Sequence, residues 1–293
     1  MGGTIVAERL DGRLCAKELE SELSSRVSIL KERGIHPHLV VIIVGQDPAS
    51  QVYVSAKQSA CERLGLKSTR HSLPDHTTQQ ELLELIESLN RDDSVHGILV
   101  QSPLPDGIDE LGVTDAINPS KDVDGFHPEN LGRLIQGRKD ALFPCTPSGI
   151  IHLLKWADVD LTGKQVAVIG RSRIVGMPLS VMLAARGVDA SVSIVHSRTK
   201  GIEEICKQAD VLIAAVGNAN LVTKDWIKPG AVVVDVGVNR VDDDNHERGW
   251  YLAGDVHPEV SEIASMISPV PGGVGPMTIV SLMANTIKVA ENF

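Results

Sequence analysis

Tyr53 and Lys57 stand four residues apart in a segment with helical spacing, which predicts that both side chains project from one face of a helix. This helix would follow the apolar run at 39–44, so the pair would lie near the carboxyl end of a buried strand. An aromatic platform beside an amine is a plausible catalytic pair. The alternative is a helix with a partly buried tyrosine and a solvated lysine, which is the commoner fate of such residues.

Other polar residues follow a further apolar run at 96–101. Gln101 ends this run and precedes a proline-rich turn, and ligands of open α/β folds bind where strands end in this way. Asp122 and Asp124 occupy the long loop that comes next. A carboxylate there could accept hydrogen bonds from a heterocyclic amine and a ring N–H, or could belong to an Asx-turn. The spacing reveals no paired acid and base carboxylates, no Ser-His-Asp triad and no metal-binding motif, and no metal is expected.

A possible nucleotide site lies within 161–187, which reads as strand, glycine-rich turn and helix. The β-branched run at 166–169 suits a strand buried on both faces of a parallel sheet, and Gly170 ends it. Gly176 would permit close packing of helix on strand, and unpaired N–H groups at the helix start could bind a pyrophosphate. Because the glycines are farther apart than in G-x-G-x-x-G, an ordinary turn without a ligand stays an alternative.

The next strand, at 191–195, ends where dinucleotide-binding folds recognise the adenosine ribose. Ser197 and Arg198 follow it, and no acidic residue is present to bind a ribose diol. A hydroxyl and a guanidinium at that place, with Arg171 as a second cation, suit a 2′-phosphate and favour NADP over NAD. The alternative is a group of exposed polar residues at a strand end.

The composition is that of a soluble globular protein. The chain has 293 residues, 42% of them hydrophobic, and a formal net charge of −10, so it is long enough for two ordinary domains and lacks the broad basic field that nucleic acids or membrane surfaces require. Its four cysteines are scattered, which predicts reduced structural thiols. Without an apolar stretch of about 20 residues, a signal sequence or a transit pattern, the expected location is the cytoplasm.

Apolar periodicity predicts βα units along most of the chain. Helices are expected at 14–30, 50–64, from Thr77 or Thr78 to Leu89, at 147–157 and at 279–290, and strands at 39–44, 67–72, 96–101, 166–169, 191–195, 211–216 and 232–236. Prolines and glycines leave only short helices between 102 and 146, around 110–117 and 130–136, and make 268–278 a predicted loop. Long loops at strand ends usually carry function.

Several motifs spread over nearly the whole chain carry a joint resemblance to one family. They are YVSAK at 53–57, Gln101 with the PLP after it, KDVDGF at 121–126, PCTP at 144–147, GRSRIVGMP at 170–178, DVGVNR at 235–240 and PVPGGVGPMT at 269–278. Together they strongly resemble the bifunctional methylenetetrahydrofolate dehydrogenase and methenyltetrahydrofolate cyclohydrolase.

This resemblance implies an α/β protein with two domains and a cleft between them. The N-terminal α/β domain, residues 1–147, would be the catalytic, folate-binding domain, and residues 148–277 would form a Rossmann-like NADP-binding domain with a parallel sheet. Residues 278–293 would form a C-terminal helix that packs back on the first domain. The resemblance also implies a homodimer formed through the nucleotide domains.

The chemistry implied by the resemblance is that of one-carbon folates. The family oxidises 5,10-methylenetetrahydrofolate with NADP and then hydrolyses the methenyl product to 10-formyltetrahydrofolate. Two nitrogens flank the carbon that loses the hydride and stabilise its cation, so that step needs no catalytic histidine, whereas the attack of water needs proton transfer and charge stabilisation. The alternatives are a dehydrogenase without hydrolysis and, from a different class, an inert NADP- or folate-binding module.

The resemblance also assigns roles to individual residues. Lys57 matches the family's essential lysine, Gln101 would orient and tune it, Tyr53 would stack against the folate, and Asp124 would anchor the pterin; these four form the expected catalytic set. The other expected substrate-binding residues are Val100, Pro271, Gly272, Gly273, Val274 and Gly275, and the expected cofactor-binding residues are Gly170, Arg171, Ser172, Ser197 and Val238.

The chain departs from the family pattern at two places. Ser102 stands where many members have leucine, and GDVHPEV at 254–260 replaces the commoner GDVDF. Neither departure removes a named catalytic group.

Overall fold

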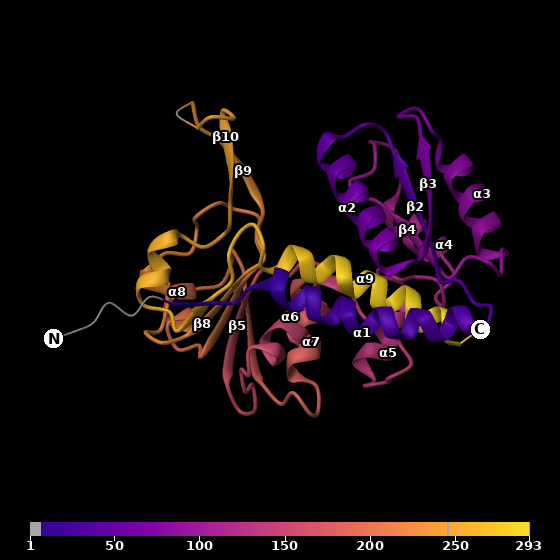
Figure 1. The fold of residues 1–293 in the computed structure, drawn as a ribbon. Helices are drawn as coiled ribbons and strands as arrows, with labels where there is room; N and C mark the ends of the chain where they lie inside the picture. Colours follow the sequence, from indigo (N-terminus) through magenta and orange to yellow (C-terminus); the bar gives the residue numbers. More distant parts are fainter. Residues whose placement is uncertain (1–6, 245, 293) are drawn as a thin grey trace. The chain divides into compact units, whose positions relative to one another are not determined.

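The computed structural model describes residues 7–244 and 246–292 (Figure 1). Their contacts divide the chain into two compact units, named here by the sheet that each contains within the described residues. Residues 7–16 and Thr146–Thr278 form the six-stranded unit, and Lys17–Cys145 with residues 279–292 form the three-stranded unit. The predicted domain limits at 147 and 277, with their folate and NADP roles, stay predictions, as does the cleft.

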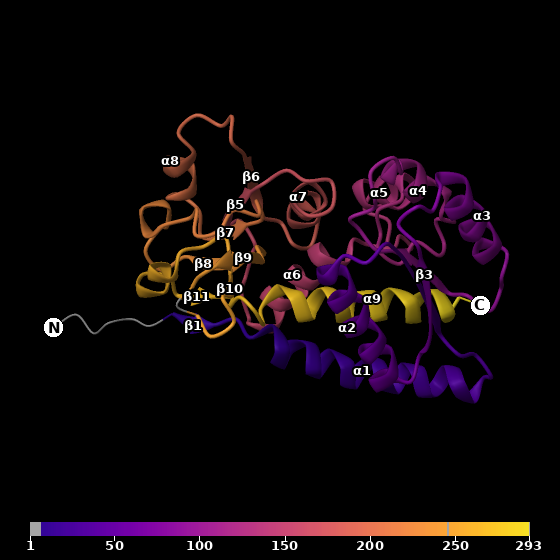
Figure 2. The same cartoon turned by 90° about the horizontal axis from the view of Figure 1, so that it is seen from above.

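The sheet of the six-stranded unit is parallel throughout, as predicted. Figure 2 shows its strands following one another from β6 to β1, the order in which they pair. The strands are β6 (Ser191–Val195), β5 (Gln165–Ile169), β7 (Val211–Ala214), β8 (Val232–Asp235), β11 (Met266–Ile267) and β1 (Glu8–Arg9). Ile169 lies opposite Val195 and Ala214, so the loops after these strands leave from one edge of the sheet.

Helices and a hairpin complete this unit. The helices are α7 (Gly176–Ala184), α8 (Ile202–Cys206), the 3-10 helices η1 (Lys224–Trp226) and η2 (Pro258–Glu262), and most of α6 (Cys145–Trp156). The hairpin of β9 (Asn239–Asp242) and β10 (Trp250–Ala253) projects from the sheet (Figure 1). It was not predicted, since β9 is largely polar and both strands are only four residues long. Arg240 supports it by lying 5.0 Å from the centre of the Trp250 ring.

The three-stranded unit is built on a parallel sheet in the order β3 (Lys67–Leu73), β2 (His38–Val44) and β4 (Gly97–Val100). Every residue of β2 is buried, which explains its uninterrupted apolar run. The helices are α2 (Pro48–Leu64), α3 (Gln79–Asn90), α4 (Glu110–Ala116), α5 (Pro128–Ile135) and most of α1 (Gly12–Glu32) and α9 (Val274–Ala290). Thr78 is the N-cap of α3 and forms a capping box with Glu81.

A buried lysine fastens the long loop of this unit to α3. The ammonium of Lys121 donates to the carbonyl oxygens of Leu89, Asn90 and Asp92 at 3.1, 2.9 and 2.7 Å. These carbonyls lie at and just beyond the end of α3, where a helix lacks internal donors and favours a cation. Lys121 therefore fixes one end of the segment that carries Asp122 and Asp124.

Helix α9 begins earlier than the sequence indicated. The prediction of a loop through 268–278 is wrong for residues 274–278, because α9 begins at Val274 and tolerates Pro276 in its first turn. Farther along, Asn285 donates to the carbonyl oxygens of Val123 and Phe143 at 2.8 and 2.9 Å. Within the described residues, none of the helices is both long and apolar enough for a membrane span.

Candidate active site

Lys57 and Gln101 form the centre of the site in the three-stranded unit. Helix α2, which carries Lys57, starts at the end of β2, where Asp47 accepts the Ser50 N–H at 2.7 Å. The partly buried Lys57 ammonium donates to Oε1 of Gln101 at 2.8 Å. Tyr53, one turn earlier on α2, keeps 45% of its surface exposed. The structure therefore brings Lys57 and Gln101 into direct contact.

Gln101 is held at both its backbone and its side chain. Its N–H donates to the Ile42 carbonyl at 2.8 Å, directly after the last residue of β4, Val100. Its Nε2 donates to the Ser102 carbonyl at 2.7 Å. The amide is thereby oriented with Oε1 toward Lys57.

Asp124 lies close enough to Lys57 for their charges to interact. Burial lowers the pKa of Lys57 below the ordinary value of lysine, while the Asp124 carboxylate opposes that shift. Burial likewise raises the pKa of Asp124, and the charge of Lys57 opposes the rise. This pairing lets a partly buried amine and carboxyl group coexist with perturbed pKa values, which is common at catalytic sites.

Cys145 is a neighbour that sequence reasoning assigned no role. Its thiol donates to the Val123 carbonyl at 3.2 Å and also hydrogen-bonds with Asp124. Burial raises the pKa of Cys145 well above its usual value, so the thiol stays neutral. The PCTP motif was the available signal, but only the fold brings Cys145 to Asp124. All four cysteines are free and buried.

The two aspartates of the long loop have different surroundings. Asp122 is buried and accepts the backbone N–H groups of Gly125, Phe126 and His127 at 3.2, 3.3 and 2.8 Å, and Nδ2 of Asn130 at 2.9 Å. It therefore shapes the loop, as the turn alternative proposed. Asp124 instead faces Lys57 and Cys145 and is the carboxylate available for a ligand.

Close backbone contacts explain why the predicted nucleotide turn has glycine at two positions. Gly170, at φ 114°, ends β5, and a Cβ there would lie 2.2 Å from the Ala215 carbonyl oxygen. A Cβ on Gly176 would lie 2.2 Å from the Gly170 carbonyl oxygen. The predicted close packing of α7 on β5 is confirmed, and the turn offers backbone that a ligand can approach closely.

The N–H groups at the start of α7 are not unpaired, so that part of the prediction is wrong. Ser172 occupies them: its Oγ accepts from Val175 and Gly176 at 3.1 and 3.4 Å, and its carbonyl accepts from Met177 at 3.0 Å. The longer glycine spacing leaves room for this internal cap. Charge for a bound anion must therefore come from side chains such as Arg171, which is exposed and forms no ion pair in the described part of the chain.

The other expected cofactor residues lie at the same edge of the sheet. Ser197 is exposed and follows β6, the neighbour of β5, whereas Val238 follows β8 and is 44% exposed. Because all these strands are parallel, their carboxyl ends share one edge. The structure thus groups Gly170, Arg171, Ser172, Ser197 and Val238 along that edge.

Two aspartates that sequence reasoning missed organise this edge. Asp235, at the end of β8, accepts from the N–H groups of Gly237, Asp255 and Val256 at 3.0, 2.9 and 3.0 Å. Burial raises the pKa of Asp235 to about 6. Asp255 is also buried, and both residues lie in segments whose DVG and GDV sequences are the signals that could have found them.

The expected substrate residues at 271–275 belong to the six-stranded unit. Pro271 is exposed, Gly272 has φ 112°, and the Gly273 N–H donates to the Pro269 carbonyl at 2.8 Å. Val274 and Gly275 are the first two residues of α9. The structure therefore does not bring these five residues together with Lys57 in one unit.

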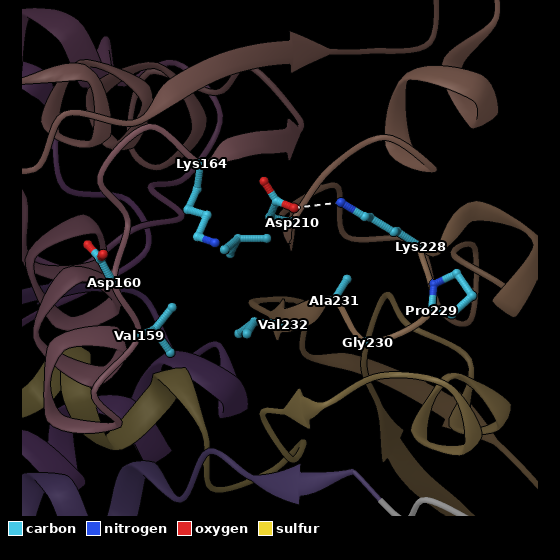
Figure 3. Close-up of a pocket in the computed structure, with 10 residues that line it drawn as sticks. Val159, Asp160, Lys164, Asp210, Lys228, Pro229, Gly230, Ala231 and Val232 are labelled. Carbon is cyan, nitrogen blue, oxygen red and sulfur yellow. Dashed lines mark hydrogen bonds and ion pairs between the residues drawn. The ribbon is translucent and has the colours of Figure 1, made fainter. Parts of the chain in front are cut away.

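A surface pocket of about 180 Å³ lies at the opposite edge of the six-stranded sheet. Figure 3 shows Lys164, Asp210 and Lys228 around it, with Asp210 and Lys228 paired at 2.6 Å. These residues lie near the amino ends of β5, β7 and β8, away from the glycine turn. Among residues 7–244 and 246–292, no group of three or more His, Cys, Asp or Glu side chains is arranged to hold a metal ion.

Family models match both parts of the chain. The tetrahydrofolate dehydrogenase/cyclohydrolase catalytic domain matches residues 10–124, and the NAD(P)-binding domain of the same family matches residues 144–293. The chain belongs to the tetrahydrofolate dehydrogenase/cyclohydrolase family. The predicted family is therefore confirmed, and so is the predicted class of two-domain α/β proteins.

Members of this family resemble the chain over almost its whole length. The bifunctional protein FolD of Prosthecochloris aestuarii is 51% identical over 284 residues, 95% of this chain and 96% of that protein. The structure of the bifunctional enzyme FolD from Campylobacter jejuni has a TM-score of 0.93 and 48% identity, covering 98% and 99% of the two chains. The Trypanosoma brucei enzyme, solved with NADP and an inhibitor, has a TM-score of 0.92 and 39% identity, covering 98% of each chain.

We expect Gly176→Ala to destabilise the six-stranded unit by about 1–3 kcal/mol, the usual cost of overpacking, because its Cβ would collide with Gly170. The matched control is Gly275→Ala, in the first turn of α9, which lies within the residues of this unit. A Cβ on Gly275 would meet nothing within 4 Å. Urea unfolding followed by fluorescence suits the comparison, since Trp156, Trp226 and Trp250 all belong to this unit. Equal unfolding midpoints for the two variants would contradict the expectation.

Proposed function

We propose that this protein is a bifunctional one-carbon folate enzyme. It oxidises 5,10-methylenetetrahydrofolate to 5,10-methenyltetrahydrofolate with NADP and hydrolyses the product to 10-formyltetrahydrofolate. The observation that carries the proposal is the 2.8 Å hydrogen bond from Lys57 to Gln101 beside Asp124, in a chain of this family. The relatives at about half identity bear the name bifunctional protein FolD.

In the hydrolytic step, Lys57 accepts a proton from the attacking water. The water oxygen bonds to the methenyl carbon and one of its protons passes to Lys57. The oxygen then loses its second proton as the formyl C=O forms, one carbon–nitrogen bond breaks, and the released nitrogen takes up a proton. Burial lowers the pKa of Lys57, so its neutral amine, which can accept the proton of the water, is more accessible than that of an ordinary lysine. Gln101 accepts an N–H of Lys57 and thereby fixes the direction of the amine.

The remaining residues of the three-stranded unit hold the folate. Asp124 accepts hydrogen bonds from the amino group and ring N–H of the pterin, a role that its contact with Lys57 supports by favouring the ionised carboxylate. Tyr53, with its exposed ring one turn from Lys57, stacks on the folate, and Val100 contacts it beside Gln101. Residues 271–275 are proposed to line the substrate as well.

NADP fits the carboxyl edge of the six-stranded sheet, where Gly170 and Gly176 leave no side chain against the turn. When bound, NADP supplies the acceptor for the hydride that leaves the methylene carbon. Arg171 and Ser197 bind its 2′-phosphate, Gly170 and Ser172 contact it at the turn, and Val238 packs against its apolar part. The exposed guanidinium of Arg171 supports this assignment.

The protein is also proposed to be a homodimer, formed through the six-stranded unit, and to be located in the cytoplasm. Partly exposed Ile194 on the edge strand β6 supports a contact surface on this unit. Sedimentation equilibrium at micromolar concentration is expected to give twice the mass of the chain. A single species with the mass of one chain would contradict the dimer.

The proposed function is tested by assaying both reactions on one preparation. We expect the wild-type protein to reduce NADP with methylenetetrahydrofolate and to hydrolyse methenyltetrahydrofolate, and Lys57→Ala to lose at least about 100-fold of the hydrolysis, the usual contribution of acid–base catalysis. Lys17→Ala, an exposed lysine of the same unit, is the matched control and keeps both rates. Absence of both wild-type activities would refute the enzyme, and reduction without hydrolysis would favour the dehydrogenase alone.

The choice of cofactor has a separate test. We expect Arg171→Ala to raise the KM for NADP about tenfold and to leave the KM for NAD unchanged, because a guanidinium–phosphate hydrogen bond contributes about 1.5–3 kcal/mol and only NADP has the 2′-phosphate. Arg186→Ala, an exposed arginine just beyond α7, is the control. A wild-type preference for NAD would refute the assignment of Arg171 and Ser197.

A further inference from the structure

Asp255 is the most completely enclosed acidic side chain at the carboxyl edge of the six-stranded sheet, with 0% of its surface exposed. Its Oδ2 accepts the N–H groups of Val216 and Gly217 at 2.7 and 3.0 Å. Its Oδ1 accepts the N–H of Asn218 at 2.8 Å and Nδ2 of Asn239 at 3.0 Å. The two carboxylate oxygens together accept four hydrogen bonds from two segments that are distant in the sequence.

The first segment is the turn after β7. The second begins with Asn239, the first residue of β9, which directly follows the turn after β8. The two turns flank the proposed cofactor. The turn after β7 packs against the glycine turn, since the Ala215 carbonyl oxygen occupies the space that a Cβ of Gly170 would need. The turn after β8 carries Val238, and both Val238 and Val216 expose apolar side chains. Asp255 therefore fixes the distance between the two sides of the cofactor-binding edge.

The backbone of Asp255 is itself held by a second carboxylate. Asp235 accepts the N–H groups of Asp255 and Val256. The two aspartates lie so close to the backbone that two neighbouring positions must be glycine. A Cβ on Gly237 would lie 2.1 Å from Oδ1 of Asp255, and one on Gly254 would lie 1.7 Å from Oδ2 of Asp235. The Asp255 carboxylate is therefore held in a fixed place, and its hydrogen bonds determine where the loops lie.

We propose that Asp255 is a positioning residue for NADP: by clamping the turns after β7 and β8 it sets the shape that the dinucleotide must fit, without touching the reacting atoms. This inference rests on the proposed function. Asp255 acts on the cofactor and not on hydrolysis, because Lys57 and Gln101 belong to the three-stranded unit.

The test compares Asp255→Asn with the wild-type enzyme. The substitution keeps the shape of the side chain but turns one acceptor into an NH₂ group that faces the N–H donors of the loops. We expect the KM for NADP to rise about tenfold, with kcat at saturating NADP and the rate of methenyltetrahydrofolate hydrolysis, which is measured without NADP, within about twofold of wild type. A variant that was merely less well folded would lose both activities in parallel.

Asp210→Asn is the matched control. Asp210 directly precedes β7 in the same unit and also accepts a backbone N–H, that of Gln165 at 3.0 Å, together with Lys228, but it lies at the pocket on the opposite edge (Figure 3). The KM of the Asp210→Asn enzyme for NADP is expected to equal that of the wild type. An equal rise in both variants would overturn the role of Asp255.

A second variant covers the case in which Asp255→Asn does not fold. Asn239→Ala removes one donor to Asp255 at a partly buried position and is expected to raise the KM for NADP about threefold. An unchanged KM in whichever of the two variants folds would overturn the inference. If the wild-type enzyme did not reduce NADP, the proposed function would fail instead, and fluorescence titration with NADP would still decide whether Asp255→Asn weakens binding.

Discussion

The structure depends on satisfying the backbone of irregular loops at the carboxyl edge of each parallel sheet. A strand that ends there leaves N–H groups with no partner in the sheet, and buried unpaired donors cost about 1–3 kcal/mol each. Both units use the same arrangement, in which one buried aspartate accepts three successive backbone N–H groups and one asparagine amide. Asp122 does so for residues 125–127 with Asn130, and Asp255 does so for residues 216–218 with Asn239.

A buried carboxylate is a costly way to order a loop, which explains what surrounds it. Desolvation of one charge costs several kcal/mol, and hydrogen bonds to a charged acceptor return about 1.5–3 kcal/mol each, so more than one such bond is needed to offset the cost. Glycines let the backbone approach the carboxylates closely, as Gly237 does at Asp255 and Gly254 does at Asp235. Lys121 completes the pattern with the opposite charge, since it satisfies three carbonyl oxygens at the end of α3. The loops that carry the proposed ligand contacts are therefore rigid parts of the fold.

The sequence predicted the regular elements well, because each depends on local patterns. The buried run of β2, the capping box of α3 and the steric need for Gly176 could all be inferred from spacing. The failures come from contacts between distant residues. The internal cap by Ser172, the early start of α9 and the asparagine donors to Asp122 and Asp255 depend on where the chain returns, which apolar periodicity does not encode. The family resemblance supplied the expected roles of Lys57, Gln101 and Asp124, and the structure supports these expectations with a physical basis.

That basis is a balance between burial and one neighbouring charge. Burial alone lowers the pKa of Lys57 and raises that of Asp124, so it favours the neutral form of each group. Their mutual attraction opposes both shifts, so the charged pair stays accessible while a neutral amine remains within reach. In the proposed folate complex, a pterin that hydrogen-bonds with the Asp124 carboxylate would weaken the attraction between Asp124 and Lys57. Binding of the folate would thus lower the pKa of Lys57 further and favour the neutral amine at the moment when water must lose its proton.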